Sequence, residues 1–312
     1  MDFFEAMIHH NPLLLNGLIA GLLASICCGI IGPYVITRRI VMASGAISHM
    51  AIGGVGVGLF MAYMWVDPAF RQGLEQFTGG LLAAPEGGTA AGSPTREQLD
   101  QAALLGAMGA AVIGALLIGL VHQRIHERMD TLLGAMWAVG MSIGLVMLKL
   151  TPAYQTEVTA YLFGNISFVP RSELWILAAL AGCVLLTVLV FHKRFVAICL
   201  DQQQAELQGI HTLWTNLVLL VLVAFTVLTV MRVVGLVLVL ALLALPAATA
   251  GHHATRLVHM MWISVLLCVL LTTVPRILVY GTPISPEPAT VLAAGGVYLG
   301  SVILRRAVLA LR

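Results

Sequence analysis

The sequence is short of charge. Of its 312 residues, only 10% are Asp, Glu, Lys or Arg, whereas 60% are hydrophobic. Soluble globular domains carry about 25% charged residues, so a soluble fold of this composition would have too few polar side chains to cover its surface. The net charge of +2 also leaves no basic face for nucleic acid. The composition therefore predicts an all-α, polytopic transmembrane helical bundle with lipid as its solvent.

Lysine is the rarest charged residue, and its absence from one motif is informative. Lys149 and Lys193 both lie outside the pattern G-x-x-x-x-G-K-[ST], which forms the phosphate-binding loop of ATPases. The predicted spans also lack an H-E-x-x-H motif, paired carboxylates and a nucleophile beside a base. We therefore expect neither ATP hydrolysis nor an intramembrane enzyme.

Cysteine is sparse and its spacing is uninformative. No two of the five cysteines form a C-x-x-C pair, and most lie inside apolar runs. This distribution is typical of small buried hydrophobes rather than of a disulfide framework or a metal site.

Long hydrophobic runs are what the sequence does have. A helix needs about 20 apolar residues to cross the hydrocarbon core, and a charge at its centre costs about 2.5–3.5 kcal/mol on insertion scales. Nine segments meet the requirement, although 131–148 is short and 233–251 follows its neighbour after Arg232 alone, so eight spans remain an alternative. The predicted spans are 13–36, 45–66, 102–121, 131–148, 174–191, 213–231, 233–251, 257–275 and 288–304.

The distribution of Lys and Arg predicts the orientation. Basic residues accumulate in cytoplasmic connections. If Arg38 and Arg39 lie in the cytoplasm, that side receives ten basic residues and the outer side six. This places the N-terminus outside and the C-terminus in the cytoplasm.

We predict a single transmembrane domain over 1–312. Two of the connections between its spans are long. Residues 67–101 form an extracytoplasmic loop rich in Gly, Ala and Pro, and the capping-box spacing from Thr95 to Gln98 predicts a helix start there. Residues 192–212 form the main cytoplasmic segment. Its polar stretch from Asp201 through Glu206 to Gly209 predicts a short surface helix that ends at the glycine.

Histidines are the candidate metal ligands. His49 lies in a span that carries five glycines from Gly45 to Gly58, a composition that lets neighbouring helices approach closely. Neutral imidazole binds zinc and other divalent transition metals well. The simpler interpretation is a histidine at a helix end that bonds water or a backbone carbonyl. Both interpretations remain open at this stage.

A second group of histidines and one proline also stand out. His252, His253 and His259 lie near a cytoplasmic connection, and His252 and His259 share a face if one helix carries both. They are either a metal-exit patch or ordinary interfacial residues. Pro246, late in the span after Gly235, removes a backbone hydrogen bond and predicts a kink. That segment is either a simple kink or a moving part of a translocation path.

The predicted spans contain no acidic residue. Proton-coupled and ion-coupled carriers place such groups in the membrane as relays and ligands. Without them, and without a phosphate-binding loop, the chain shows no energy source of its own. Either a partner supplies the energy or the protein is a passive channel.

Several stretches in order resemble one family, the membrane permeases of bacterial zinc, manganese and iron ABC importers. The resemblance covers about residues 13 to 305. Its motifs are Ser44-Gly-Ala-Ile-Ser-His49, Asp130-Thr-Leu-Leu-Gly134, Ala160-Tyr-Leu-Phe-Gly164, the polar stretch that ends at Gly209, and Val233-Val-Gly235 through Leu245-Pro246-Ala-Ala-Thr-Ala250.

The resemblance implies partners. It implies a homodimer on two copies of a separate ATPase, with metal delivered by an extracytoplasmic binding protein. The stretch from Asp201 through Glu206 to Gly209 would dock on the ATPase. No prosthetic group is implied, only the transported ion, with zinc first because imidazole suits it and manganese or iron next.

The resemblance also implies site residues, with one departure. His49 would lie on the metal path and Glu157 on the outer side. Many relatives carry an Asp one helical turn before the histidine, where this chain has Gly45. The alternatives are an ABC permease for a metal chelate or siderophore and a stand-alone secondary carrier or channel.

Overall fold

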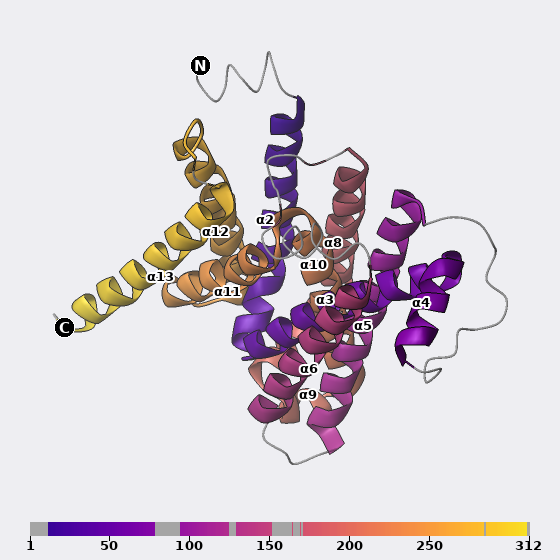
Figure 1. The fold of residues 1–312 in the computed structure, drawn as a ribbon. Helices are drawn as coiled ribbons and strands as arrows, with labels where there is room; N and C mark the ends of the chain where they lie inside the picture. Colours follow the sequence, from indigo (N-terminus) through magenta and orange to yellow (C-terminus); the bar gives the residue numbers. More distant parts are fainter. Residues whose placement is uncertain are drawn as a thin grey trace. The chain divides into compact units, whose positions relative to one another are not determined.

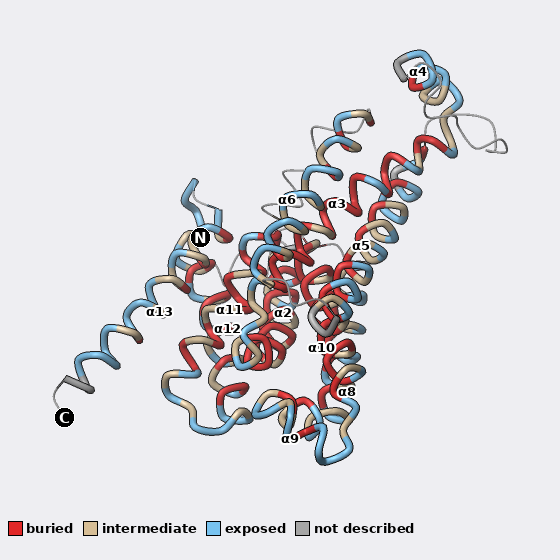
Figure 2. Tube along the Cα trace, turned by 90° about the horizontal axis from the view of Figure 1, so that it is seen from below, coloured by how far each residue is buried: buried red, intermediate tan, exposed pale blue. Residues whose placement is uncertain are grey.

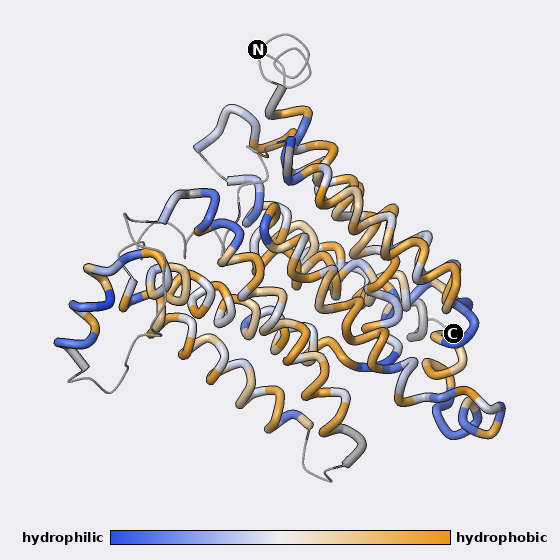
Figure 3. The backbone as a smooth tube through the Cα atoms, turned by 90° about the vertical axis from the view of Figure 1, so that its right-hand side faces the viewer, coloured by the Kyte–Doolittle hydropathy of each residue, from blue (hydrophilic) through white to orange (hydrophobic). Residues whose placement is uncertain are grey.

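The structure is a computed structural model. It describes residues 12–78, 94–124, 129–151, 164, 169, 171–283 and 285–310. Within these residues, all regular secondary structure is helical. Nine of these described helices are long and apolar enough to cross a membrane, which confirms the predicted polytopic bundle and its two least certain spans. Hydrophobic residues run along the helices, and hydrophilic residues gather at the connections (Figure 3).

Most helices extend beyond their predicted limits. The segment predicted to end at 191 continues to Leu200. Because of these extensions the helix ends carry charges, including an ion pair of 3.6 Å between Arg232 and Glu173. The helices are α2 (Pro12–Thr37), α3 (Val41–Val66), α4 (Pro68–Thr78), α5 (Arg96–Arg124), α6 (Met129–Leu150), α8 (Arg171–Leu200), α9 (Gln202–Leu207), α10 (Thr212–Val234), α11 (Leu236–His253), α12 (Leu257–Leu278) and α13 (Pro286–Ala310).

The chain divides into two compact units. The first comprises Met1–Ser44 and Thr159–Arg312, and the second comprises Gly45–Val158. The first unit therefore contains α2 and α8 to α13, and the second contains most of α3 with α4 to α6 (Figure 1).

Glycines bring the helices of the second unit together. A Cβ added at Gly54 of α3 would collide with the carbonyl oxygen of Gly106 in α5, and one at Gly53 with that of Gly140 in α6. The backbones therefore touch where no side chain intervenes, as small residues permit in membranes. The prediction that the glycines of this span allow close approach is confirmed.

The core of the first unit surrounds α2. Gly29 lies against Val265 of α12, and a Cβ at Gly32 would meet the carbonyl of Leu243 in α11. α10 is also buried along most of its length, whereas α13 is largely exposed (Figure 2). The exposed apolar side chains of the outer helices are expected to face lipid.

A single residue separates α10 from α11. Gly235 has φ 86° and ψ 159°. It is both the C-cap of α10 and the N-cap of α11. This positive φ is a conformation that glycine adopts without the steric cost of a Cβ. The chain therefore changes direction between two spans with no loop (Figure 1).

Pro246 lies buried inside α11. A proline cannot donate to the carbonyl four residues before it, here that of Leu242. The thiol of Cys268 in α12 donates to this carbonyl at 3.5 Å. This cysteine, expected to be only a small hydrophobe, therefore supplies a substitute donor for the carbonyl that the proline leaves free.

Part of the predicted outer loop is helical. The side chain of Asp67 accepts hydrogen bonds from the backbone of Ala69 at 2.9 Å and Phe70 at 3.2 Å, and this cap begins α4. Leu74 of α4 then packs on Phe60 of α3. At the other end of the loop, Thr95 and Gln98 form the predicted capping box with bonds of 3.0 and 3.4 Å.

Candidate functional site

His49 lies on α3 with only 6% of its surface exposed. Its ring stacks on Trp137 of α6, with 4.3 Å between the ring centroids and 22° between the planes. The Nδ1 atom has no hydrogen-bond partner within the described residues. A buried polar atom without a partner is unfavourable by about 1–3 kcal/mol, so this nitrogen is suited to a donor or a cation that arrives from outside the described structure.

Trp137 also explains the departure at Gly45. A Cβ added at Gly45 would lie 3.3 Å from Cζ3 of Trp137. An aspartate carboxylate at this position would therefore compete with the indole for the same space. In this chain the imidazole of His49 is paired with an aromatic face.

His49 does not belong to a larger cluster of metal-ligating side chains within the described residues. Among them, no group of three or more His, Cys, Asp or Glu side chains could hold a metal ion. Glu157 lies outside the described residues, so its role stays a prediction. The described part of the site therefore consists of the buried imidazole of His49 stacked on Trp137.

Two sequence motifs meet at the junction of α10 and α11. Gly164, the last residue of the Ala160–Gly164 motif, has φ 66°, and a Cβ there would collide with the backbone of Val234 and Gly235. The motif glycine thus packs directly on the glycine where the chain turns. Any side chain at position 164 would push these two segments apart.

The predicted short helix is present as α9 (Gln202–Leu207), and it ends beside Gly209 as the sequence predicts. The carboxylate of Asp201 accepts from the backbone of Gln203 at 2.8 Å and Gln204 at 3.2 Å. At the other end, Gly209 has φ 78°, and backbone bonds from Gly209 and Ile210 close a Schellman motif. The Glu206 carboxylate accepts a hydrogen bond of 2.5 Å from the hydroxyl of Thr212, which ties α9 to α10.

Arg38 connects the end of α2 to α8, α9 and α10. Its guanidinium donates to the carbonyl of Ile198 at 2.8 Å and to the side-chain oxygen of Asn216 at 3.1 Å. A longer contact of 3.4 Å reaches Gln202 at the start of α9. The sequence indicated only that this arginine sets the orientation, whereas the structure shows that it also anchors the short helix.

Comparison with known proteins decides the family. The ABC 3 transport family matches residues 10–83 and 97–305. The chain belongs to this family. A probable metal transport system membrane protein from Chlamydia trachomatis serovar D is 31% identical and matches 95% of this chain and 90% of its own length. A manganese transport system membrane protein, MntC, from Halalkalibacterium halodurans is 26% identical over 70% of this chain and 61% of its own.

Solved structures agree with the ABC 3 permease fold. The chain matches PsaBC from Streptococcus pneumoniae with a TM-score of 0.74 and 22% identity, over 96% of this chain and 94% of that one. A putative metal-chelate type ABC transporter in an inward-facing conformation matches at 0.51 and 16% identity. Through its membership of the ABC 3 transport family, the protein is a membrane permease subunit of an ABC transporter.

In this ABC 3 family permease, the second group of histidines does not share one helix face. α11 ends at His253 and α12 begins at Leu257, so His252 and His259 belong to different helices. The continuous helix on which that expectation depended is interrupted. His252 and His253 instead contact the same hydroxyl, that of Ser301, at 3.0 and 3.1 Å.

Proposed function

We propose that the chain is the membrane permease of an ATP-driven importer that moves a divalent transition-metal ion into the cytoplasm. The observation that carries this proposal is the family match along nearly the whole chain, together with relatives named for metal transport. The working unit would be a homodimer in the bacterial cytoplasmic membrane with its N-terminus outside. A separate ATPase and an extracytoplasmic metal-binding protein would complete it.

The capped helix α9 supports the proposed docking of an ATPase. Asp201 and Gly209 fix its two ends, and Glu206 ties it to α10. Beside Glu206, the side chain of Leu207 is 89% exposed. A rigid surface helix with an exposed apolar side chain is suited to bind a groove on a partner protein.

Among the metals, we propose manganese ahead of zinc and iron. Relatives from Halalkalibacterium halodurans and Streptococcus gordonii are named for manganese. This order reverses the zinc preference that an imidazole alone indicates. His49 would act as a weak ligand on the path, and Gly235 and Pro246 would let the segment around α11 move.

Uptake of radioactive manganese and zinc into vesicles tests the proposal. The vesicles contain the permease with its ATPase and its metal-binding protein, and uptake is compared with and without ATP. We expect His49→Ala to lower ATP-dependent uptake by roughly tenfold or more while the ATPase still co-purifies. His259→Ala, which removes an exposed histidine of α12, is the matched control and should keep its uptake. Metal flux that needs no ATPase would overturn the proposal in favour of a carrier or channel.

A metal-chelate permease is the second candidate because one matching structure is a putative transporter of that type. Competition separates the two functions. Free metal salt should compete with radioactive metal for uptake, and a siderophore-bound metal should not. The reverse pattern would favour the chelate.

A further inference from the structure

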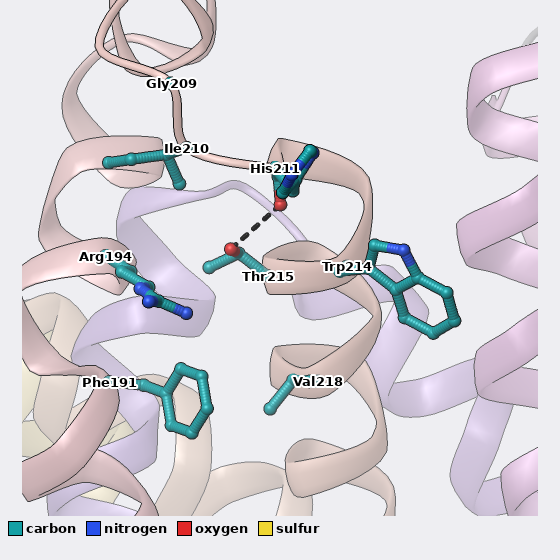
Figure 4. Close-up of a pocket in the computed structure, with 8 residues that line it drawn as sticks. All are labelled: Phe191, Arg194, Gly209, Ile210, His211, Trp214, Thr215 and Val218. Carbon is teal, nitrogen blue, oxygen red and sulfur yellow. Dashed lines mark hydrogen bonds between the residues drawn. The ribbon is translucent and has the colours of Figure 1, made fainter.

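A cavity of about 340 Å³ lies between α8 and α10, beside the end of α9. Phe191 and Arg194 of α8 line one side, and Thr215 and Val218 of α10 line the other (Figure 4). His211 and Trp214 complete its rim. None of the residues proposed for the metal path lines this cavity.

The polar end of the cavity is positively charged. The guanidinium of Arg194 lies over the ring of Phe191, 5.5 Å from its centroid, and within the described residues no carboxylate pairs with it. Neither acid of the adjoining α9 segment lines the cavity: Asp201 caps the start of α9, and Glu206 accepts a hydrogen bond from Thr212. Arg194 therefore keeps its donors for an anion, and a guanidinium binds a phosphate through two parallel hydrogen bonds.

The other end of the cavity is apolar and lies deeper in the span. Val218 is about 9 Å along α10 from Thr212 at 1.5 Å per residue, and Phe191 precedes the basic run at 192–194. Trp214, which is 67% exposed, is of the type that gathers at the boundary between lipid and water. The cavity thus changes from basic to apolar along the axis of α10.

This gradient decides between two kinds of occupant. A protein that docks from the cytoplasm meets the surface of the bilayer and does not reach the depth of Val218. A phospholipid fits both ends, because its phosphate lies at the boundary and its acyl chains lie beneath. Basic pockets between transmembrane helices on the cytoplasmic side bind acidic head groups.

We propose that this cavity binds an anionic phospholipid of the surrounding bilayer, with the phosphate on Arg194 and an acyl chain against Phe191 and Val218. The bound head group would contact the turn from Gly209 to His211, which joins α9 to α10. An anionic lipid would thereby steady the helix proposed to meet the ATPase. The binding itself does not depend on which substrate the permease carries.

Native mass spectrometry of the purified permease tests this inference, with phosphatidylglycerol and phosphatidylcholine offered in equal amounts. We expect wild type to retain phosphatidylglycerol preferentially, and Arg194→Gln to reduce that preference by about fivefold. Lys193→Gln is the matched control because it removes the same charge from the neighbouring exposed residue, which does not line the cavity. It should keep the preference.

Two further measurements test whether the acyl chain, and not only the phosphate, is bound in the cavity. Val218→Trp fills the apolar end and should lower retention of phosphatidylglycerol while Arg194 stays in place. Inorganic phosphate should not displace the bound lipid, because it lacks the acyl chain. Equal losses in Arg194→Gln and Lys193→Gln, displacement by inorganic phosphate, or loss of lipid when the ATPase is added would each overturn the proposal. Thermal unfolding of every variant shows that the protein is folded.

Discussion

Replacing Arg38 tests the connection between α2 and α9 most directly. Its guanidinium donates to Ile198 at 2.8 Å, to Asn216 at 3.1 Å and to Gln202 at 3.4 Å. A hydrogen bond to a charged group contributes about 1.5–3 kcal/mol, and the contact to Gln202 is long for one. Because Arg38 is partly exposed, water replaces some of the loss. We therefore expect Arg38→Gln to destabilise the permease by about 2–3 kcal/mol.

The neighbouring arginine provides the control. Arg39 is exposed and has φ 58°, so Arg39→Gln removes the same charge and leaves the same backbone conformation with a similar side chain. The assays are the thermal unfolding midpoint in nanodiscs and the ratio of metal transported to ATP hydrolysed. We expect Arg38→Gln to lower both values and Arg39→Gln to lower neither. Equal results for the two variants would refute the anchoring role of Arg38.

Three further substitutions test contacts inside the units. Gly164→Ala should lower the yield of folded protein, because φ 66° and the adjacent backbone exclude a Cβ. Gly182→Ala is the control and should not lower the yield, because its added Cβ faces open space. The level of each variant in the membrane measures the yield. Cys268→Val should destabilise by about 1–3 kcal/mol because a buried carbonyl loses its donor, and Cys268→Ser should unfold at a higher temperature than Cys268→Val. Gly45→Asp should reduce folded yield, and adding Trp137→Ala should restore it if the indole is the obstacle; chromatography of the detergent extract compares the two.

The spans could be predicted because their cause is local. A run of about 20 apolar residues has no other stable arrangement in lipid, so all nine appear where the hydropathy indicates. Their ends were less predictable, since helices such as α8 continue beyond the hydrocarbon into water as far as Leu200. α4 was missed although its signals were present. Asp67 is an N-cap residue, Pro68 follows at the first helical position, and Leu74 shows the apolar periodicity.

The contacts of the candidate site could not be predicted in the same way. The approach of Gly164 to Gly235 joins segments far apart in the sequence, so no local pattern predicts it. The bonds of Arg38 likewise need α8, α9 and α10 to be placed first. His49 was found from its residue type alone, but its stacking on Trp137 depends on how α3 packs against α6.

Polar groups in the described spans are mostly satisfied within their own helices. Thr226 donates to the carbonyl of Leu222 at 2.8 Å, and Thr249 donates to that of Leu245 at the same distance. Few buried atoms of the described residues lack a partner, and Nδ1 of His49 is one of them. A buried imidazole nitrogen without a partner is therefore an exception among the described residues of the spans.

The position of His49 along the chain bears on how energy would reach it. Arg38 contacts Gln202 at the start of α9. Three residues after Arg38, α3 begins at Val41, and His49 lies about two turns further along α3. A passive channel needs no such connection, and a proton-driven carrier needs acids that the predicted spans lack. An ATP-driven permease does need a connection between the helix that meets the ATPase and the metal path. We therefore expect Arg38→Gln to leave ATP hydrolysis without proportionate metal movement. His49→Ala should lower metal movement by roughly tenfold or more with the assembly intact. Transport by Arg38→Gln that stays in proportion to hydrolysis would show that the force reaches α3 by another route.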